Sequence, residues 1–188
     1  MASWRLISRR IRVPMGFAFA VLFFWLAQPS VVSMLLGAVA IFAGLLIRAL
    51  ASGHVRKNEQ LATTGPYAYT RNPLYLGSLV MAAGFAGAAR SWWVAAAVLV
   101  FFLVIYVPVI LGEEEFLRRT FPEFEDYVRE VPRLLPRFWK GPVPGPGKPD
   151  KGASGFSWDL YRQHHEYNAL VGALAMLAAL AGKMIWNA

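Results

Sequence analysis

Residues 65–77 (GPYAYTRNPLYLG) gather side chains that could bind or transform a ligand: three tyrosines, an arginine and two glycines. Gly65-Pro66 is a turn signal, and Asn72 before Pro73 predicts a helix start with an asparagine N-cap and proline at the first helical position. The free N–H groups of such a start favour an anionic group. An ordinary helix start with interfacial tyrosines is the simpler alternative.

A second segment, Glu113-Glu114-Glu115, follows a long apolar run directly. Adjacent carboxylates at the end of a membrane span repel one another and oppose the helix dipole, so their presence indicates a function. The alternative is a solvated continuation of the helix, with i,i+4 pairs Glu114–Arg118 and Glu115–Arg119. This alternative explains Glu115 better than the two glutamates that lie nearer the membrane.

Long apolar runs must position both segments, because 57% of the 188 residues are hydrophobic. Roughly 20 apolar residues cross a bilayer core as an α-helix. Unbroken runs of this length do not alternate as strands do, and lipid requires backbone groups to be satisfied within the segment. We therefore expect an all-α, multi-pass membrane protein with a four-helix core and an appended C-terminal fifth span. The five expected spans are residues 13–27, 31–50, 73–89, 92–111 and 169–186.

Basic residues predict how the spans are oriented. With the N-terminus in the cytosol, 17 of the 19 lysines and arginines fall on the cytosolic side. The positive charge then reflects orientation and attraction to anionic lipids rather than nucleic-acid binding. The short outer turns at residues 28–30 and 90–91 leave no room for a site, so we expect the chemistry at the cytosolic face.

Three regions follow from this pattern. Residues 1–140 are expected to form the membrane core with a cytosolic C-terminal cap. Residues 141–157, rich in proline and glycine, form a linker, and residues 158–188 form an interfacial segment and the fifth span. This last span is expected to be less involved in the site.

Composition excludes several kinds of chemistry. The chain has no cysteine, so disulfides, thiolate metal sites and cysteine nucleophiles are absent. His164 and His165 are adjacent, so on a helix they point about 100° apart. Without a spaced partner they predict an interfacial helix start and no metal site. The glycine-rich strand–helix fingerprint of dinucleotide-binding folds is also missing.

Together the two segments resemble the isoprenylcysteine carboxyl methyltransferase and phospholipid N-methyltransferase superfamily, over about residues 61–138. Its pattern is G-x-Y, then R-[HN]-P-x-Y-x-G at a helix start, then Glu-Glu and a V-P-R-x-x-P-like tail. Asn72 replaces a histidine common in the superfamily, and Pro122 replaces a common glycine. The fifth span also follows the tail, whereas some relatives carry extra spans before the first motif. The matching residues are Gly65, Tyr67, Arg71, Asn72, Pro73, Tyr75, Gly77, Glu113, Glu114, Leu117, Phe121, Tyr127, Arg133 and Pro136.

The resemblance implies a site for S-adenosylmethionine (SAM) at the cytosolic membrane interface. Glu113 or Glu114 would bind its ammonium group or ribose, and Arg71 with the helix start would bind its carboxylate. Arg133 would serve the head group or hold the tail over the site. Gly77 also fits plain helix packing. The implied catalytic residues are Glu113, Glu114 and Arg71. The implied cofactor-binding residues are Gly65, Tyr67, Arg71, Asn72, Pro73, Tyr75, Gly77, Glu113, Glu114 and Phe121.

The predicted function is therefore an integral membrane, SAM-dependent methyltransferase of the bacterial cytoplasmic membrane or the endoplasmic reticulum. Its acceptor would be lipid-like or amphipathic, such as a phospholipid amine or an isoprenylcysteine-type carboxylate. One alternative is an NADPH-dependent sterol- or steroid-type reductase, in which Arg71, Arg118 and Arg133 would bind a phosphate. The glutamate pair argues against that reading. The other alternative is a non-catalytic membrane scaffold.

Overall fold

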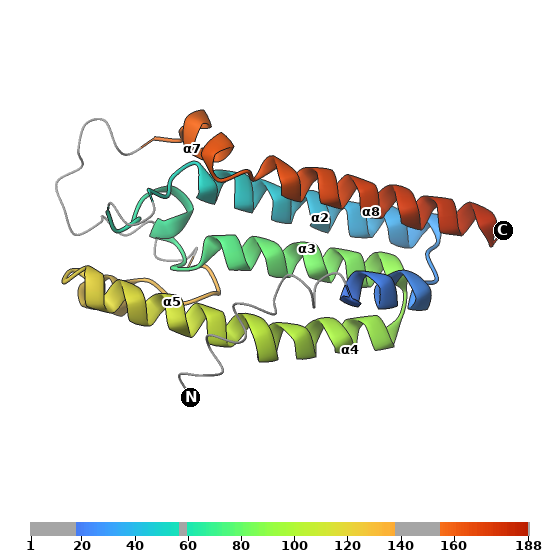
Figure 1. The fold of residues 1–188 in the computed structure, drawn as a ribbon, viewed down its shortest axis with the longest axis horizontal. Helices are drawn as coiled ribbons and strands as arrows, with labels where there is room; N and C mark the ends of the chain where they lie inside the picture. Colours follow the sequence, from blue (N-terminus) through green and yellow to red (C-terminus); the bar gives the residue numbers. More distant parts are fainter. Residues whose placement is uncertain (1–17, 57–59, 138–154, 188) are drawn as a thin grey trace.

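The computed structural model describes residues 18–56, 60–137 and 155–187, and all regular structure in these ranges is helical (Figure 1). Residues 18–26 form the first helix. The later elements are α2 (Val31–Ser52), η1 (Gly65–Ala68), α3 (Pro73–Ala89), α4 (Trp92–Phe101), η2 (Phe102–Tyr106), α5 (Val107–Thr120), α6 (Phe124–Glu130), α7 (Trp158–Gln163) and α8 (Tyr167–Trp186).

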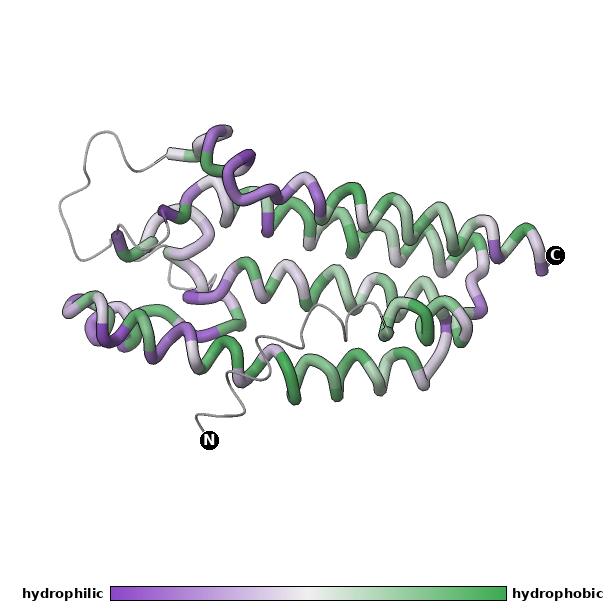
Figure 2. The backbone as a smooth tube through the Cα atoms, in the orientation of Figure 1, coloured by the Kyte–Doolittle hydropathy of each residue, from purple (hydrophilic) through white to green (hydrophobic). Residues whose placement is uncertain are grey.

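Among the described residues, three helices are long and apolar enough to cross a membrane. They are α2, α8 and the continuous 29-residue helix Trp92–Thr120, while the apolar α3 is shorter at 17 residues. Leu35, Leu36 and Val39 on α2 are 65–71% exposed, as lipid contact requires of a helix in a bilayer. Apolar residues cover the helices, and hydrophilic ones gather mainly at one end (Figure 2). These features confirm the prediction of an all-helical, multi-pass membrane protein.

Part of the predicted organisation lies outside the described residues. This applies to residues 13–17 of the first span, to the basic residues before them, and to residues 141–154 of the predicted linker. The cytosolic N-terminus and the three-region division stay predictions.

The helix that contains the predicted fourth span extends beyond it, as the alternative of a solvated continuation expected. The helix does not end at residue 111 but continues through α4, η2 and α5 to Thr120. The turn η2 is π-helical, with Val107 N–H donating to the Phe102 carbonyl, and Pro108 follows it, where a backbone donor is missing. Glu113–Glu115 therefore lie inside a helix, not at its C-terminus. Leucine, glutamate and arginine are good helix formers, which explains the continuation.

Glycines bring α2 and α3 into close contact. A Cβ at Gly84 would lie 2.7 Å from the Gly37 carbonyl oxygen, and one at Gly77 would lie 2.7 Å from that of Gly44. The two contacts are seven residues apart along each helix, so the glycines form one small-residue stripe on α2 and one on α3. Gly77, a predicted cofactor-binding residue, thus lies in the helix contact, as the packing alternative expected.

Two glycines of α3 give a matched pair of substitutions. Gly84→Ala should destabilise the protein by about 1–3 kcal/mol, because the new methyl group overlaps the backbone of α2. Gly87→Ala should be neutral or stabilising by up to about 1 kcal/mol, because its new methyl group would meet no atom of another helix within 4 Å. Thermal unfolding in detergent measures both. Equal effects of the two substitutions would contradict the close contact.

One hydrophobic cluster lies at the end of the bundle opposite the hydrophilic end. It joins Phe23 of the first helix, Ala88 of α3, Val94 of α4 and Leu180 of α8. At the same end, Lys183 Nζ donates to the carbonyl oxygens of Phe24 and Trp25, at 2.6 and 2.9 Å. The fifth span therefore packs against the other helices along a shared core.

Candidate functional site

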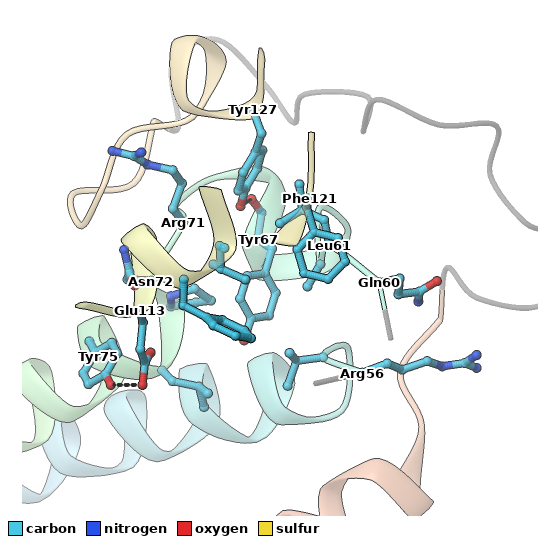
Figure 3. A pocket seen from close by; sticks show the side chains of 16 residues that line it. Arg56, Gln60, Leu61, Tyr67, Arg71, Asn72, Tyr75, Glu113, Phe121 and Tyr127 are labelled. Atoms are coloured by element: carbon cyan, nitrogen blue, oxygen red, sulfur yellow. Dashed lines mark hydrogen bonds between the residues drawn. The ribbon is translucent and has the colours of Figure 1, made fainter. Parts of the chain in front are cut away.

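A cavity of about 360 Å³ opens at the hydrophilic end of the bundle, where η1, the start of α3, α5 and α6 meet (Figure 3). Its volume lies within the range of about 300–1,000 Å³ that is usual for small-molecule sites. Aromatic and apolar side chains line most of it, with a few charged and polar groups. The lining residues are Val55, Arg56, Gln60, Leu61, Ala62, Tyr67, Arg71, Asn72, Pro73, Leu74, Tyr75, Glu113, Phe116, Leu117, Phe121 and Tyr127.

The short helix α6 covers this cavity. Its buried residues Phe124 and Tyr127 form a hydrophobic cluster with Leu61, Leu117 and Phe121. The Tyr127 hydroxyl donates to the carbonyl oxygen of Tyr67, at 2.7 Å. The cover is therefore attached both to α5 and to η1.

Tyr67 lies deep in the cavity wall. Burial raises the pKa of its hydroxyl above its usual range, and neighbouring acidic groups, including Glu113, raise it further. Burial likewise raises the pKa of Tyr127. Both hydroxyls therefore stay protonated at neutral pH and are able to donate a hydrogen bond.

Glu113 is the carboxylate that faces the cavity. It accepts a hydrogen bond of 2.8 Å from the Tyr75 hydroxyl on α3, so both side chains are held at the cavity wall (Figure 3). Tyr75 in turn packs edge-on against Tyr106 of the π-helical turn, with ring centroids 5.8 Å apart. A carboxylate at an aromatic wall is suited to a cationic ligand group.

Glu114 does not line this cavity, and it is buried, with 3% of its surface exposed. Its carboxylate accepts hydrogen bonds from Asn72 Nδ2 at 3.1 Å and from Arg133 Nε at 3.0 Å. Arg71 Nη2 lies 3.6 Å away on the same carboxylate. Glu114 thus joins the start of α3 to the tail after α6.

The two predicted i,i+4 pairs have different outcomes. Glu115 does pair with Arg119, on the exposed face of α5. The Glu114–Arg118 pair is wrong, because Arg118 pairs with Glu125 instead. The buried network around Glu114 offers it stronger, multiple donors than one exposed arginine on the same helix.

Asn72 and Pro73 begin α3 as predicted, but the Asn72 side chain makes no cap. It donates to Glu114 and, at 3.0 Å, to the Arg133 carbonyl. Two neighbours fix the same tail: Arg71 N–H donates to the Pro132 carbonyl at 2.9 Å, and Thr70 Oγ1 donates to the Leu134 carbonyl at 3.0 Å. Of the two roles left open for Arg133, these contacts match holding the tail.

Arg71 is a buried cation at the cavity wall, with a side chain that is 9% exposed. Burial lowers its pKa from the usual arginine value, while the charge of Glu114 opposes this shift. Its Nε and Nη1 atoms have no hydrogen-bond partner within the described residues. Buried donors without partners are rare in folded proteins, so this arginine is a candidate to bind an acidic ligand group.

The structure thus brings most of the predicted site residues together and leaves three outside the cavity lining. Gly65 supports η1 with a φ of 59°, and a Cβ there would lie 2.5 Å from the His54 ring. Gly77 packs against α2, and Glu114 lies in the buried network. The predicted residues that line the cavity are Tyr67, Arg71, Asn72, Pro73, Tyr75, Glu113 and Phe121.

Sequence reasoning missed the wall formed by residues 55–56 and 60–62, between α2 and η1. These residues belong to no motif, and only Arg56 carries a charge. As to metals, no group of three histidine or acidic residues in the described parts of the chain could hold an ion. His164 contacts the Ser52 carbonyl and His165 the Tyr167 hydroxyl, at 3.1 and 2.8 Å.

Fold and cavity define a class: a multi-pass helical membrane protein with a ligand-sized pocket at one end of the bundle. The chain belongs to the phospholipid methyltransferase family, whose model matches residues 17–123. This match covers both segments that carry Arg71 and Glu113, and it confirms the resemblance.

Two curated relatives are named as metal-resistance proteins. The nickel-cobalt-cadmium resistance protein NccN of Alcaligenes xylosoxydans xylosoxydans is 38% identical over 114 residues, which is 60% of this chain and 53% of NccN. The cobalt-zinc-cadmium resistance protein CzcN of Cupriavidus metallidurans is 40% identical over 82 residues, 44% of this chain and 38% of CzcN. The chain thus matches about half or less of these relatives' length. No solved structure matches it.

Proposed function

We propose that this protein is a SAM-dependent methyltransferase that acts on a lipid-like or amphipathic acceptor at the cytosolic membrane interface. The observation that carries the proposal is one aromatic cavity lined by a carboxylate, Glu113, and by a buried cation with unpartnered donors, Arg71. A phospholipid amine and an isoprenylcysteine-type carboxylate are the candidate acceptors.

The residues present fit SAM group by group. Its carboxylate suits the free donors of Arg71, and its ammonium suits Glu113. The rings of Tyr67, Tyr75 and Phe121 suit the adenine and the sulfonium cation. Bound SAM would supply an electrophilic methyl group.

The protein's own contribution is to align the acceptor and to exclude water. Phe116, Leu117 and Phe121 supply apolar walls for this purpose. Tyr67 is no base, because burial keeps its hydroxyl protonated. For an amine acceptor, which must lose a proton before it attacks, Glu113 is the cavity carboxylate suited to take it.

The two glutamates divide their roles in this proposal. Glu113 contacts the ligand, since it lines the cavity. Glu114 is a positioning residue, since Asn72, Arg71 and Arg133 occupy its carboxylate. Its function is to hold Arg71 and the α3 start against the tail.

The cytosolic placement rests on charge. Arg48, Arg56, Arg71 and the arginines of α5 and α6 lie at the cavity end of the bundle, where Figure 2 shows the hydrophilic residues. Arg90 lies at the α3–α4 turn at the opposite end. The positive-inside rule then supports a cytosolic cavity. If the chain serves metal resistance, as the names of its relatives suggest for them, we propose that it does so by methylating a membrane component.

Ligand-dependent stability tests the proposal. S-adenosylhomocysteine at a hundred times its dissociation constant should stabilise the purified protein by about 2.7 kcal/mol, and NADPH should not. Thermal unfolding in detergent measures this. Stabilisation by NADPH alone would favour the reductase, and stabilisation by neither would favour the scaffold. Lipid extract incubated with methyl-labelled SAM then identifies the acceptor.

A further inference from the structure

Arg48, near the end of α2, is bound from two sides by other helices. Its Nη2 and Nε atoms donate to the Glu166 carboxylate before α8, at 2.8 and 3.1 Å. Its Nη1 donates to Ser78 Oγ on α3, at 2.5 Å. The side chains of Arg48 and Glu166 are only 23% and 10% exposed. This bidentate ion pair is a strong contact between two residues that are 118 positions apart in the sequence.

The segment before Glu166 also holds the residues that follow α2. Ser157 N–H donates to the Gly53 carbonyl at 2.9 Å, and a His164 ring nitrogen lies 3.1 Å from the Ser52 carbonyl. The Phe156 ring packs directly against Gly53, and a Cβ added to Gly53 would lie 2.4 Å from it. Residues 52–54 are therefore clamped by residues 156–164.

The clamped residues lead straight into the cavity wall. Val55 and Arg56, the next two residues, line the cavity. The His54 ring packs against Gly65, the first residue of the turn that carries Tyr67. The charge of Glu166 makes a small contribution to the raised pKa of Tyr67, after burial, Tyr127 and Glu113.

From these contacts we infer that residues 155–166 are part of the ligand site's framework, and that Glu166 is their positioning residue. Glu166 does not line the cavity. Through Arg48 it fixes the clamp on residues 52–54, and thereby the wall at Val55 and Arg56. The family match ends at residue 123, so this framework lies beyond the shared family region. The inference rests on the proposed function for the nature of the ligand.

Binding of S-adenosylhomocysteine to the full chain tests this inference. Glu166→Gln should weaken the affinity measured by calorimetry about tenfold, a size typical of coupled contacts. Arg48→Gln should have a similar effect, and the double variant should be no worse than either single variant. Lys183→Ala is the matched control, because it loosens the other end of α8, far from the cavity. It should lower the melting temperature and leave the affinity unchanged.

Unchanged affinity in Glu166→Gln, with a melting temperature lowered as in Lys183→Ala, would overturn the inference and leave a purely structural role. A wild-type protein that binds no S-adenosylhomocysteine would instead refute the proposed function. In that case, the distance between two spin labels tests the inference without any ligand. The chain has no cysteine, so spin labels at Arg56→Cys and Asp159→Cys report on these sites alone. The distance distribution should broaden with Glu166→Gln but not with Lys183→Ala, and an unchanged distribution would overturn the inference.

Discussion

Glu113→Gln is expected to weaken S-adenosylhomocysteine binding by about 10- to 100-fold, the size of one charge-assisted hydrogen bond. The substitution keeps the shape of the side chain and a hydrogen bond to Tyr75 but removes the negative charge from the cavity. Methyl transfer should fall at least as far. Calorimetry and product formation from methyl-labelled SAM measure the two effects.

Glu115→Gln is the matched control for this experiment. Glu115 is adjacent in sequence, carries the same charge and pairs with Arg119 on the exposed face of α5. Its loss should leave binding unchanged. If both variants bound with wild-type affinity, Glu113 would not be a ligand contact.

Glu114→Ala is expected to have the largest effect on folding, about 3–5 kcal/mol of destabilisation. Removing this carboxylate leaves the buried Arg71 without its counter-charge and Asn72 with the Arg133 carbonyl as its remaining acceptor. Glu115→Ala removes an exposed pair and should cost at most about 1 kcal/mol. Unfolding of the ligand-free protein in detergent measures both free energies.

Glu114→Gln separates charge from hydrogen bonding in this network. The amide keeps an acceptor for Asn72 but does not neutralise Arg71 and Arg133. Its stability should lie between those of the wild type and the alanine variant. A Glu114→Ala protein as stable as Glu115→Ala would show that the network contributes little.

Apolar run length allowed most of the fold to be predicted. The third span was placed at residues 73–89, which are the bounds of α3, because Asn72-Pro73 and Arg90-Ser91 mark its two ends. The end of the fourth helix was not predictable in the same way, since charged residues end a lipid-facing run without ending a helix. Hydropathy indicates which residues face lipid and which face water, whereas helix propensity influences where the helix itself ends.

The site was predictable in composition but not in orientation. Arg71, Tyr75 and Glu113 do meet at one cavity. The sequence could not rank Glu113 and Glu114, because adjacent helical residues differ only in direction. It also could not pair Arg48 with Glu166, since they are separated by 118 residues and neither belongs to a motif.

The π-helical turn η2 has a consequence for how this chain tolerates insertions and deletions. A π turn takes up one residue more than an α-helical turn, so the helix downstream keeps the direction it would have without the extra residue. A regular α-helix through the same sequence would rotate every downstream side chain by about 100°. The three adjacent glutamates lie downstream of η2, and Tyr106 within it packs on Tyr75, the partner of Glu113. The π turn therefore helps to determine that Glu113, rather than a neighbouring glutamate, faces the cavity. Deleting one residue from η2 should convert it to a regular α-helical turn and leave Glu113 at the cavity, whereas inserting one residue there should turn another side chain toward it.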